Sequence, residues 1–363
     1  MKYLLFTLEY PPTIGGVGNY YANLVKHWPD KDSIDVYDIS KDKEIPKTNF
    51  KAWPKIVKRL NKKVKENNIN HIIVGHILPL GTATFLASFF SKFSYSVSLH
   101  GLDYSIATKK CYKKLLSFAI LKRAKKIICA NSFLAKKLLD DFPQFKDKLV
   151  ISNPGAEVLA VDENVKKQLI DKYKLAGKKI IFSMGRLVQR KGFDYSILAL
   201  SQLKKQNYDL YKNTIYLIAG TGPDEDNIKK LAKENEVLEN TIFLGNLSPL
   251  GQEKFAFYSL CDVFLMPARQ IDHDFEGFGI VYLEANLFKK PVVAGNSGGV
   301  SDAVSDNLNG LLIKPESISE IKEALEKILS NDKLANDLGE KGYLRAKEKF
   351  NWKYLAKNLK NNL

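Results

Sequence analysis

The chain has 363 residues, 45% of them hydrophobic and 26% charged, which is ordinary for a globular protein and long enough for two domains. No apolar run approaches the ~18–20 residues of a membrane-spanning helix. The first apolar segment is short and is interrupted by Glu9, so we expect a strand there and no signal peptide. The three cysteines have no paired spacing, which indicates small core residues in a reducing compartment.

The positive charge is concentrated in the first half of the chain. Residues 1–155 contain 26 Lys and Arg against 12 Asp and Glu, whereas residues 156–363 contain 30 against 28. The first half therefore carries +14 of the net charge of +16. This asymmetry favours an anionic partner for that half: a membrane surface, a phosphorylated acceptor or nucleic acid. A general enrichment in lysine would produce the same numbers without such a partner.

Strand-like and helix-like segments alternate along the first half. Short apolar runs predict strands at 2–10, 33–40, 71–76, 95–101, 126–131 and 148–156. A glycine loop followed by a helix is expected at 13–28, a basic helix at 55–68 and an aromatic helix at 82–93. The segment 109–126 contains eight basic side chains and no acidic one.

After Pro154-Gly155 the alternation restarts, with apolar runs at 178–186, 214–220, 240–245, 263–267 and 290–295. Strands that alternate with helices imply parallel sheets covered on both faces. We therefore predict an α/β protein of two doubly wound, Rossmann-like domains facing a cleft, with ligands at the carboxyl ends of the strands. The predicted domains are 1–156 and 157–344, and a final charged helix at about 345–363 packs back on the first domain.

The segment from Glu276 to Asp302 combines two carboxylates with two glycine-rich turns. Glu276 opens the loop EGFG, where small residues let backbone amides approach a ligand. Glu284 lies eight positions later in a helical pattern, and the unpaired N–H groups at the start of that helix would attract an anion. Carboxylates placed in this way can accept hydrogen bonds from sugar hydroxyls. A capped helix with a solvent-facing Glu284 has the same pattern.

Arg186 and Lys191 are five residues apart, between Gly185 and Gly192, and follow a predicted strand. The planar guanidinium and the ammonium group can flank a diphosphate. A solvated basic turn is the alternative, but the position at the end of a strand favours ligand binding.

Two features of the first half also lie at strand ends. His100 follows a strand beside a glycine and is either a structural hydrogen-bonding residue or a ligand contact, and His76 has the same placement. The loop with Gly16 and Gly18 lies between the first strand and its helix, where a phosphate can bind. It matches a dinucleotide fingerprint only in part, because Tyr21 occupies the place of the third glycine.

Asp272 and Asp274 form a D-x-D pattern, which could hold Mg²⁺ or Mn²⁺ on a nucleotide diphosphate. Arg186, Lys191 and a helix N-terminus would already neutralise that charge, so we predict that no metal is required. In that case the two carboxylates balance the basic residues that face them.

Several motifs together resemble those of the retaining glycosyltransferase family 4, which has the GT-B fold: GGVGNY, SLHG, GRLVQRKG, AGTGPDEDNIKKLA, FLGNLS and EGFGIVYLEA with PVVAGNSGGVSDAV. The resemblance covers most of the chain in the same order and includes the spacing between Glu276 and Glu284. Around EGFGIVYLEA the sequence is similar to bacterial phosphatidylinositol-mannoside mannosyltransferases and to lipopolysaccharide or capsule transferases.

The resemblance implies a role for each matching residue. Arg186 and Lys191 would bind the donor diphosphate and stabilise charge on the departing phosphate. Glu276 would hold sugar hydroxyls, and His100 would contact the donor sugar near its reacting carbon. The remaining donor-binding positions are the backbone amides of Phe278, Gly279 and Ile280 for sugar or phosphate, Glu284 for the ribose, Leu247 for the nucleobase, and Gly16 beside the diphosphate.

The implied reaction is transfer of a hexosyl unit from GDP-mannose or a UDP-sugar to a lipid-linked or cell-surface glycan, as in O-antigen, lipopolysaccharide, capsule or glycolipid synthesis. No cofactor is expected besides the donor, and no nucleic acid, because the basic half lacks a recognised binding motif. The acceptor is expected on the first domain. The segment 109–126 and the phenylalanines of 82–93 would seat a cytoplasmic enzyme on the anionic inner leaflet of the membrane, unless these phenylalanines belong to the core.

Other functions fit parts of the sequence. A sugar-nucleotide 2-epimerase of the same fold would convert the donor without an acceptor. A non-enzymatic protein that binds carbohydrate, nucleic acid or another anionic ligand is a further alternative, and the basic surface favours the anionic ligands. A nicotinamide-linked oxidoreductase is favoured only by the incomplete glycine loop and by Asp35 and Asp38, which lie near the expected ribose acid.

Overall fold

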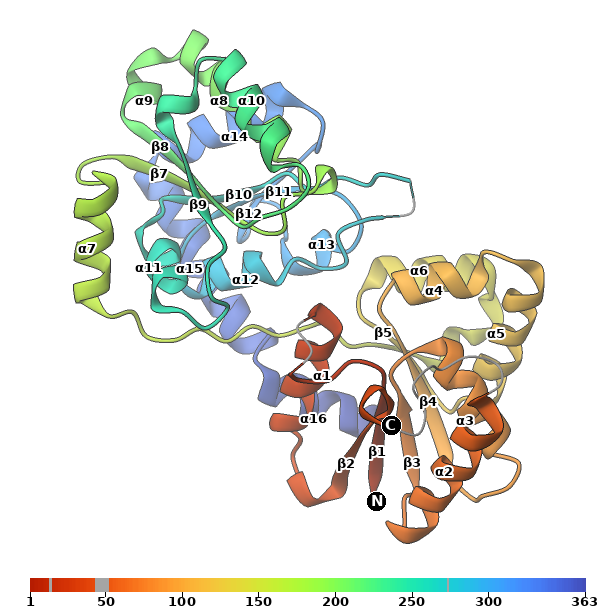
Figure 1. The fold of residues 1–363 in the computed structure, drawn as a ribbon. Helices are drawn as coiled ribbons and strands as arrows, with labels where there is room; N and C mark the ends of the chain where they lie inside the picture. Colours follow the sequence, from red (N-terminus) through yellow and green to blue (C-terminus); the bar gives the residue numbers. More distant parts are fainter. Residues whose placement is uncertain (13–14, 43–51, 273) are drawn as a thin grey trace. The chain divides into compact units, whose positions relative to one another are not determined.

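The computed structural model describes residues 1–12, 15–42, 52–272 and 274–363, which form two compact units. The first unit comprises Met1–Pro154 and Trp352–Leu363, and the second comprises Gly155–Asn351. The division at Pro154-Gly155 lies two residues before the predicted one. Each unit is an α/β layer structure around its own parallel sheet (Figure 1).

The sheet of the first unit has six parallel strands in the order β2-β1-β3-β4-β5-β6. They are β1 (Tyr3–Thr7), β2 (Ile34–Asp38), β3 (His71–Val74), β4 (Ser94–Leu99), β5 (Ile127–Cys129) and β6 (Leu149–Ile151). The order moves outward from β1 in both directions, so the carboxyl ends of β1 and β3 lie at the point where it reverses. Ligands bind at such points in open parallel sheets.

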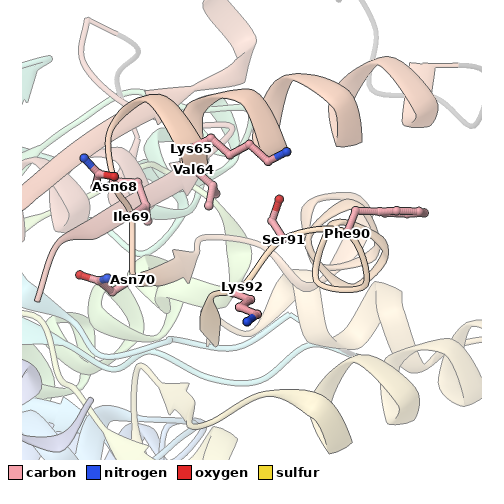
Figure 2. Close-up of a pocket in the computed structure, with 8 residues that line it drawn as sticks. All are labelled: Val64, Lys65, Asn68, Ile69, Asn70, Phe90, Ser91 and Lys92. Atoms are coloured by element: carbon pink, nitrogen blue, oxygen red, sulfur yellow. The ribbon is translucent and has the colours of Figure 1, made fainter.

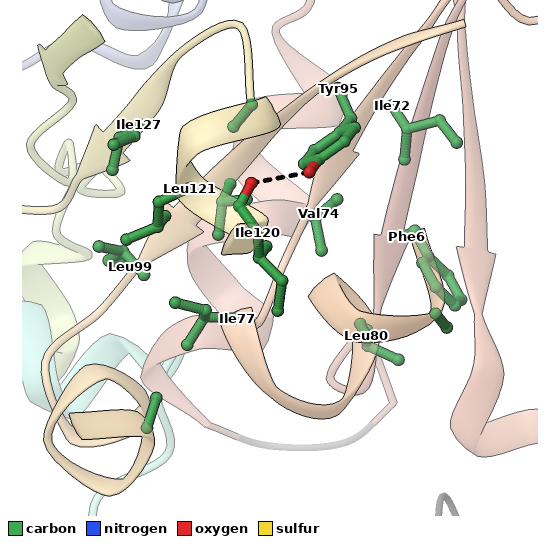
Figure 3. Close-up of a cluster of buried hydrophobic side chains, with 14 of the residues drawn as sticks. Phe6, Ile72, Val74, Ile77, Leu80, Tyr95, Leu99, Ile120, Leu121 and Ile127 are labelled. Carbon is green, nitrogen blue, oxygen red and sulfur yellow. Dashed lines mark hydrogen bonds between the residues drawn. The ribbon is translucent and has the colours of Figure 1, made fainter. Parts of the chain in front are cut away.

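Helices cover both faces of this sheet because its central strands are apolar on both sides. They are α1 (Gly16–Lys26), α2 (Trp53–Glu66), α3 (Thr82–Ala87), α4 (Leu102–Thr108), α5 (Cys111–Arg123), α6 (Ser132–Asp141) and α16 (Trp352–Asn362). One core layer contains Phe6, Val74 and Ile120, and the hydroxyl of Tyr95 donates a hydrogen bond of 2.7 Å to the carbonyl of Ile120 within it (Figure 3). The other layer contains Leu5, Tyr20 and Trp352.

The sheet of the second unit also has six parallel strands, in the order β12-β11-β10-β7-β8-β9. They are β7 (Lys179–Met184), β8 (Thr214–Ala219), β9 (Thr241–Gly245), β10 (Val263–Met266), β11 (Val292–Gly295) and β12 (Gly310–Ile313). Its helices are α7 (Glu163–Tyr173), α8 (Phe193–Gln206), α9 (Tyr208–Lys212), α10 (Glu225–Glu234), α11 (Gln252–Leu260), α12 (Ile280–Leu287), α13 (Val300–Ala303), α14 (Ile318–Leu329) and α15 (Asp332–Lys349). Two hydrophobic clusters, one with Phe264 and Tyr282 and one with Ile218 and Leu265, form its core.

The predicted final helix at 345–363 is two helices. Helix α15 belongs to the second unit and ends at Lys349, and α16 begins at Trp352 and belongs to the first. Trp352 packs edge-on against Tyr20, with ring centroids 5.6 Å apart, so only α16 returns to the first unit. The chain leaves the helical path at Phe350, whose carbonyl accepts a hydrogen bond of 3.1 Å from the amide of Ala156.

The aromatic helix predicted at 82–93 ends at Ala87, as helix α3. Phe85 and Phe93 pack against the core, whereas Phe89 is 58% and Phe90 72% exposed. The alternative of a core set is therefore right for Phe85 and Phe93 and wrong for Phe89 and Phe90, and the membrane-facing role stays a prediction.

Candidate active site

The turn that carries Arg186 and Lys191 lies at the carboxyl end of β7. The chain forms a short 3₁₀ turn over Gln189–Lys191 and then enters α8. Gly192 is needed at the junction, because its φ is +76° and a Cβ there would lie 2.2 Å from the carbonyl oxygen of Pro267. The turn leaves the side chain of Arg186 exposed and that of Lys191 buried.

Lys191 points at the carboxylate of Glu276. Its Nζ lies 2.5 Å from Oε2 of Glu276, and Nη1 of Arg190 lies 2.8 Å from the same oxygen. Among the described residues, the hydrogen bonds to this carboxylate all end on Oε2. The other oxygen, Oε1, is thus available to a ligand hydroxyl.

The ion pairs keep Glu276 charged although it is only 8% exposed. Burial by itself would raise the pKa of Glu276, but the charges of Lys191 and Arg190 and their hydrogen bonds hold that pKa below its ordinary value. An ionised carboxylate can only accept hydrogen bonds. Glu276 is therefore suited to binding hydroxyl groups and unsuited to donating a proton.

A second glycine-rich turn holds the backbone of Glu276. The amide of Gly299 donates a hydrogen bond of 2.9 Å to the carbonyl of Glu276. At Gly298, φ is +58° and a Cβ would lie 2.4 Å from the same carbonyl oxygen. The close approach of the NSGG turn to the EGFG loop therefore requires a residue without a side chain at Gly298.

The EGFG loop leads into helix α12. Gly279 precedes the helix with φ +83°, and a Cβ would lie 2.3 Å from the ring of Tyr282. That ring is fully buried, and its hydroxyl donates a hydrogen bond of 2.8 Å to the carbonyl of Met266. Among the residues that the structure describes, no side chain caps the N-terminus of α12. The amide groups at Phe278, Gly279 and Ile280 thus lie where a helix N-terminus favours an anion.

Glu284 is 8% exposed, and both of its carboxylate oxygens have partners. Lys254 Nζ lies 2.6 Å from Oε1, and the hydroxyl of Tyr258 donates a hydrogen bond of 2.8 Å to Oε2. The alternative of a solvent-facing Glu284 is wrong. Lys254 and Tyr258 lie on α11, and the sequence analysis did not identify either of them. Leu247, in the loop after β9, is also buried.

Asp274 of the D-x-D segment forms an ion pair with Arg190. Asp274 Oδ2 lies 3.1 Å from Nε of Arg190, and Asp272 is exposed with φ +53°. His273 lies outside the described residues. Within the part of the chain that the structure describes, no group of three or more His, Cys, Asp or Glu side chains is arranged to hold a metal ion.

In the first unit, His100 lies directly after β4 in a box of aromatic rings. The rings of Tyr20 and Tyr21 pack edge-on against it, with centroids 5.3 and 5.2 Å away. The amides of His100 and Gly101 both donate to Oδ1 of Asp103, at 2.9 and 3.0 Å, which fixes the turn. Burial, with a smaller contribution from the charge of His76, lowers the pKa of His100 to about 3. His100 is therefore neutral near pH 7.

Gly16 is the first residue of α1 and is exposed. A Cβ at Gly16 would meet no atom of the described residues within 4 Å, so their packing does not require glycine there. His76 follows β3, and its Nε2 lies 3.5 Å from Oε1 of Glu9. The sequence analysis did not consider Glu9 as a site residue, because its partner lies in another strand-end loop.

The structure thus brings Lys191 and Glu276 together and adds Arg190 and Asp274 to them. Glu284 belongs to a separate buried cluster with Lys254. Gly16 and His100 belong to the first unit.

A pocket of about 430 Å³ in the first unit is unrelated to these residues (Figure 2). It lies between the end of α2 and the segment that follows α3. Its lining residues are Val64, Lys65, Asn68, Ile69, Asn70, Phe90, Ser91 and Lys92, and none of them is a predicted site residue.

Residues 162–345 match the family model described as Glycosyl transferases group 1. A GDP-mannose-dependent alpha-(1-6)-phosphatidylinositol monomannoside mannosyltransferase of Mycobacterium tuberculosis is 25% identical over 380 positions, which cover 99% of this chain and 97% of the relative. A glycosyltransferase of Rickettsia africae has a TM-score of 0.79 at 18% identity and covers 99% of this chain and 98% of its own. Anabaena HepE, solved with UDP, has a TM-score of 0.79 at 16% identity, with 99% of each chain covered.

The structural likeness extends over both units and confirms the predicted GT-B fold class of two parallel α/β sheets. The family match contains Arg186, Lys191, Leu247, Glu276 and Glu284 and extends over half of the chain. The chain therefore belongs to the group 1 glycosyl transferases and is a glycosyltransferase.

Proposed function

We propose that this glycosyltransferase transfers a hexosyl unit, with retention of configuration, from a nucleotide-diphosphate sugar to a lipid-linked or cell-surface glycan. The observation that carries the proposal is the buried contact between Lys191, Arg190 and Glu276 beside the uncapped start of α12. The two cations and the amides at the start of α12 suit a diphosphate, and the carboxylate suits sugar hydroxyls. A solvated basic turn would need none of these contacts.

Each residue has a defined task in this proposal. Lys191 and the exposed Arg186 bind the diphosphate, and Glu276 accepts hydrogen bonds from the hexose through Oε1. The amides at Phe278, Gly279 and Ile280 bind the sugar or a phosphate oxygen. In addition, Glu284 holds the ribose, the backbone at Leu247 meets the nucleobase, Gly16 borders the diphosphate and His100 contacts the sugar.

The reaction breaks the bond between the anomeric carbon and the β-phosphate oxygen, and the bonding electrons leave with the nucleoside diphosphate. The acceptor oxygen forms the new bond on the same face of the sugar, and its proton passes to the departing phosphate oxygen. Cations held beside that phosphate stabilise the charge that develops in the transition state. This chemistry needs no metal, so EDTA should leave the turnover unchanged.

The relatives suggest two candidate donors, which differ in base and sugar. The Mycobacterium tuberculosis relative is GDP-mannose-dependent by name, and HepE was solved with UDP. Both GDP-mannose and UDP-hexoses therefore remain in the proposal. In this proposal the nucleobase is bound by the backbone at Leu247, and such contacts suit either nucleotide.

We place the acceptor on the first unit, at the anionic inner leaflet of the cytoplasmic membrane. Among the described residues, no helix is long and apolar enough to cross a bilayer. The support for peripheral binding is the exposed surface of α4, α5 and their connection, where Leu102, Tyr112 and Leu115 are 70%, 64% and 70% exposed and Lys109 and Lys110 are also exposed. Apolar side chains among lysines suit an interfacial contact with anionic lipid.

Two measurements test the proposed function. Thermal unfolding with UDP, GDP, ADP or NAD⁺ should show stabilisation by UDP or GDP, because a ligand that binds only the folded state raises the melting temperature. Product analysis with UDP- and GDP-sugars, with and without a cellular lipid extract, should show sugar transfer only with the extract. Conversion of the donor without an acceptor would indicate an epimerase, and stabilisation by NAD⁺ alone would contradict the proposal.

A further inference from the structure

A buried tyrosine hydroxyl joins His100 to the backbone of a neighbouring strand end. Tyr21 is fully buried on α1, and its hydroxyl donates a hydrogen bond of 2.8 Å to the carbonyl oxygen of Gly75, which follows β3. The same hydroxyl lies 2.7 Å from Nε2 of His100. Both distances are those of hydrogen bonds.

Counting protons fixes the direction of both bonds. The carbonyl of Gly75 can only accept, and the hydroxyl of Tyr21 has a single proton to donate. Burial raises the pKa of Tyr21 well above its ordinary value, so this proton is retained at neutral pH. The hydroxyl therefore donates to Gly75, and the bond to His100 is made by a proton on Nε2.

A neutral imidazole carries one proton. If that proton is on Nε2, then Nδ1 of His100 has a free lone pair and is a hydrogen-bond acceptor. The hydroxyl of Ser98 lies 3.3 Å from the same Nε2. It does not change this result, because a serine hydroxyl can rotate and accept a hydrogen bond from a protonated Nε2. The protonation of one ring nitrogen is generally set by the hydrogen bond that it makes.

We infer that Tyr21 is a positioning residue that holds His100 in the Nε2–H tautomer, so that Nδ1 accepts a hydrogen bond from a hydroxyl of the donor sugar. The identity of the hydroxyl rests on the proposed function, whereas the tautomer rests on the contacts of Tyr21 alone. Tyr21 occupies the third-glycine place of the incomplete dinucleotide pattern. Its side chain has a task there that a glycine could not perform.

The neighbouring Tyr20 provides a matched control. It is also buried on α1 and packs edge-on against His100, but its hydroxyl bonds to Ser152 Oγ at 2.8 Å. Tyr20→Phe and Tyr21→Phe thus remove the same atom from the same aromatic box. Only the second removes the hydroxyl that lies 2.7 Å from Nε2.

The tautomer is measured by ¹⁵N NMR of the full chain with labelled histidine. The chain has five histidines, and the signals of His100 are those that a His100→Asn variant lacks. We expect a protonated Nε2 and an unprotonated Nδ1 in the wild type and in Tyr20→Phe, and a mixture of tautomers in Tyr21→Phe. A protonated Nδ1 in the wild type overturns the inference even if Tyr21→Phe fails to fold, and so does an unchanged Nε2–H tautomer in a folded Tyr21→Phe variant.

Turnover separates positioning from mere packing. With the tautomer mixed, kcat of Tyr21→Phe should fall about tenfold, as for one lost hydrogen bond, while the stabilisation by nucleotide is unchanged. A mixed tautomer with the wild-type kcat overturns the role of Nδ1 toward the sugar. If the wild type itself transfers no sugar, the proposed function fails while the tautomer result stands.

Discussion

At the scale of single residues, Lys191 is the side chain on which the proposed chemistry depends most directly. It is 9% exposed and contacts Glu276, which keeps Arg190 as a second partner. Lys191→Ala should therefore fold, because the buried carboxylate is still paired. Transfer should fall by about 10²–10³-fold, as for other preorganised charge contacts in a closed site. Steady-state kinetics of the variant measure this loss.

Lys229 gives the matched control for that substitution. Its Nζ lies 2.6 Å from Oε1 of Glu225, but it is 44% exposed, and such a surface pair adds little stability. Lys229→Ala should leave transfer at the wild-type level. Near wild-type turnover in Lys191→Ala would refute the role of Lys191 in the proposed mechanism.

His71 should make the stability of the chain depend on pH. It is fully buried between the hydroxyls of Ser94 and Ser96, at 2.7 and 3.0 Å, and burial lowers its pKa from 6.5 to about 4. The unfolded chain therefore binds a proton at higher pH than the folded chain. Stability is full above pH 6.5 and is lost as the pH falls towards 4, by up to about 3 kcal/mol.

Urea unfolding across this pH range measures the effect. His71→Gln removes the titrating ring, so its unfolding free energy should fall less steeply between pH 6.5 and 4 than that of the wild type. Comparison at pH 8 gives the cost of the substitution itself, since His71 is neutral there in both states. Equal slopes in the two proteins would contradict the prediction.

The sequence singled out Lys191 and Glu276 because each is a charged residue beside a glycine, which is a local signal. It did not locate Arg190, Lys254 or Tyr258. These side chains contact residues that are 86, 30 and 26 positions away in the chain, and only the folded chain determines such partners.

At the scale of elements, the turn between β7 and α8 depends on Gly192. Gly177 is its natural comparison, because φ is +70° there and +76° at Gly192, yet a Cβ at Gly177 would meet no atom within 4 Å. Gly177→Ala should cost only the ~1–2 kcal/mol of a left-handed backbone. Gly192→Ala adds a collision with the carbonyl of Pro267 and should destabilise the chain by more and weaken nucleotide binding.

Chemical denaturation of the two variants gives both free energies of unfolding. Thermal shifts with UDP or GDP then show whether the turn still binds a diphosphate. Equal destabilisation by Gly177→Ala and Gly192→Ala would mean that the turn moves without cost and does not preorganise Lys191.

The strands were the elements that the sequence predicted best. Of the twelve strands in the described residues, ten fall within predicted apolar runs and β4 begins one residue before its run, because parallel strands covered on both faces are continuously apolar. The exception, β12, is a four-residue edge strand whose pairing with β11 requires Gly310 to lie against Val292. The break between α15 and α16 was also missed. Helical spacing continues through it, and only tertiary packing separates the two helices.

At the scale of the whole molecule, the two halves of the sequence differ in charge although the two units share a sheet architecture. Residues 1–155 carry +14 and residues 156–363 carry +2. Sedimentation with anionic and with neutral vesicles tests whether the basic half binds an anionic membrane. We expect binding to phosphatidylglycerol vesicles that weakens with added salt, and little binding to phosphatidylcholine, because the attraction is screened within a Debye length.

Leu115 and Leu250 show whether the α4–α5 surface makes the contact. They are 70% and 75% exposed, but Leu115 lies on α5 of the first unit and Leu250 lies on the second unit. Leu115→Ser should lower vesicle binding because it removes an apolar side chain from among lysines, and Leu250→Ser should not. Lys110→Gln should weaken binding about fivefold, since a basic residue near an anionic surface is worth ~1 kcal/mol. Equal binding to both kinds of vesicle, or equal effects of the two leucine variants, would show that this surface does not hold the enzyme on a membrane.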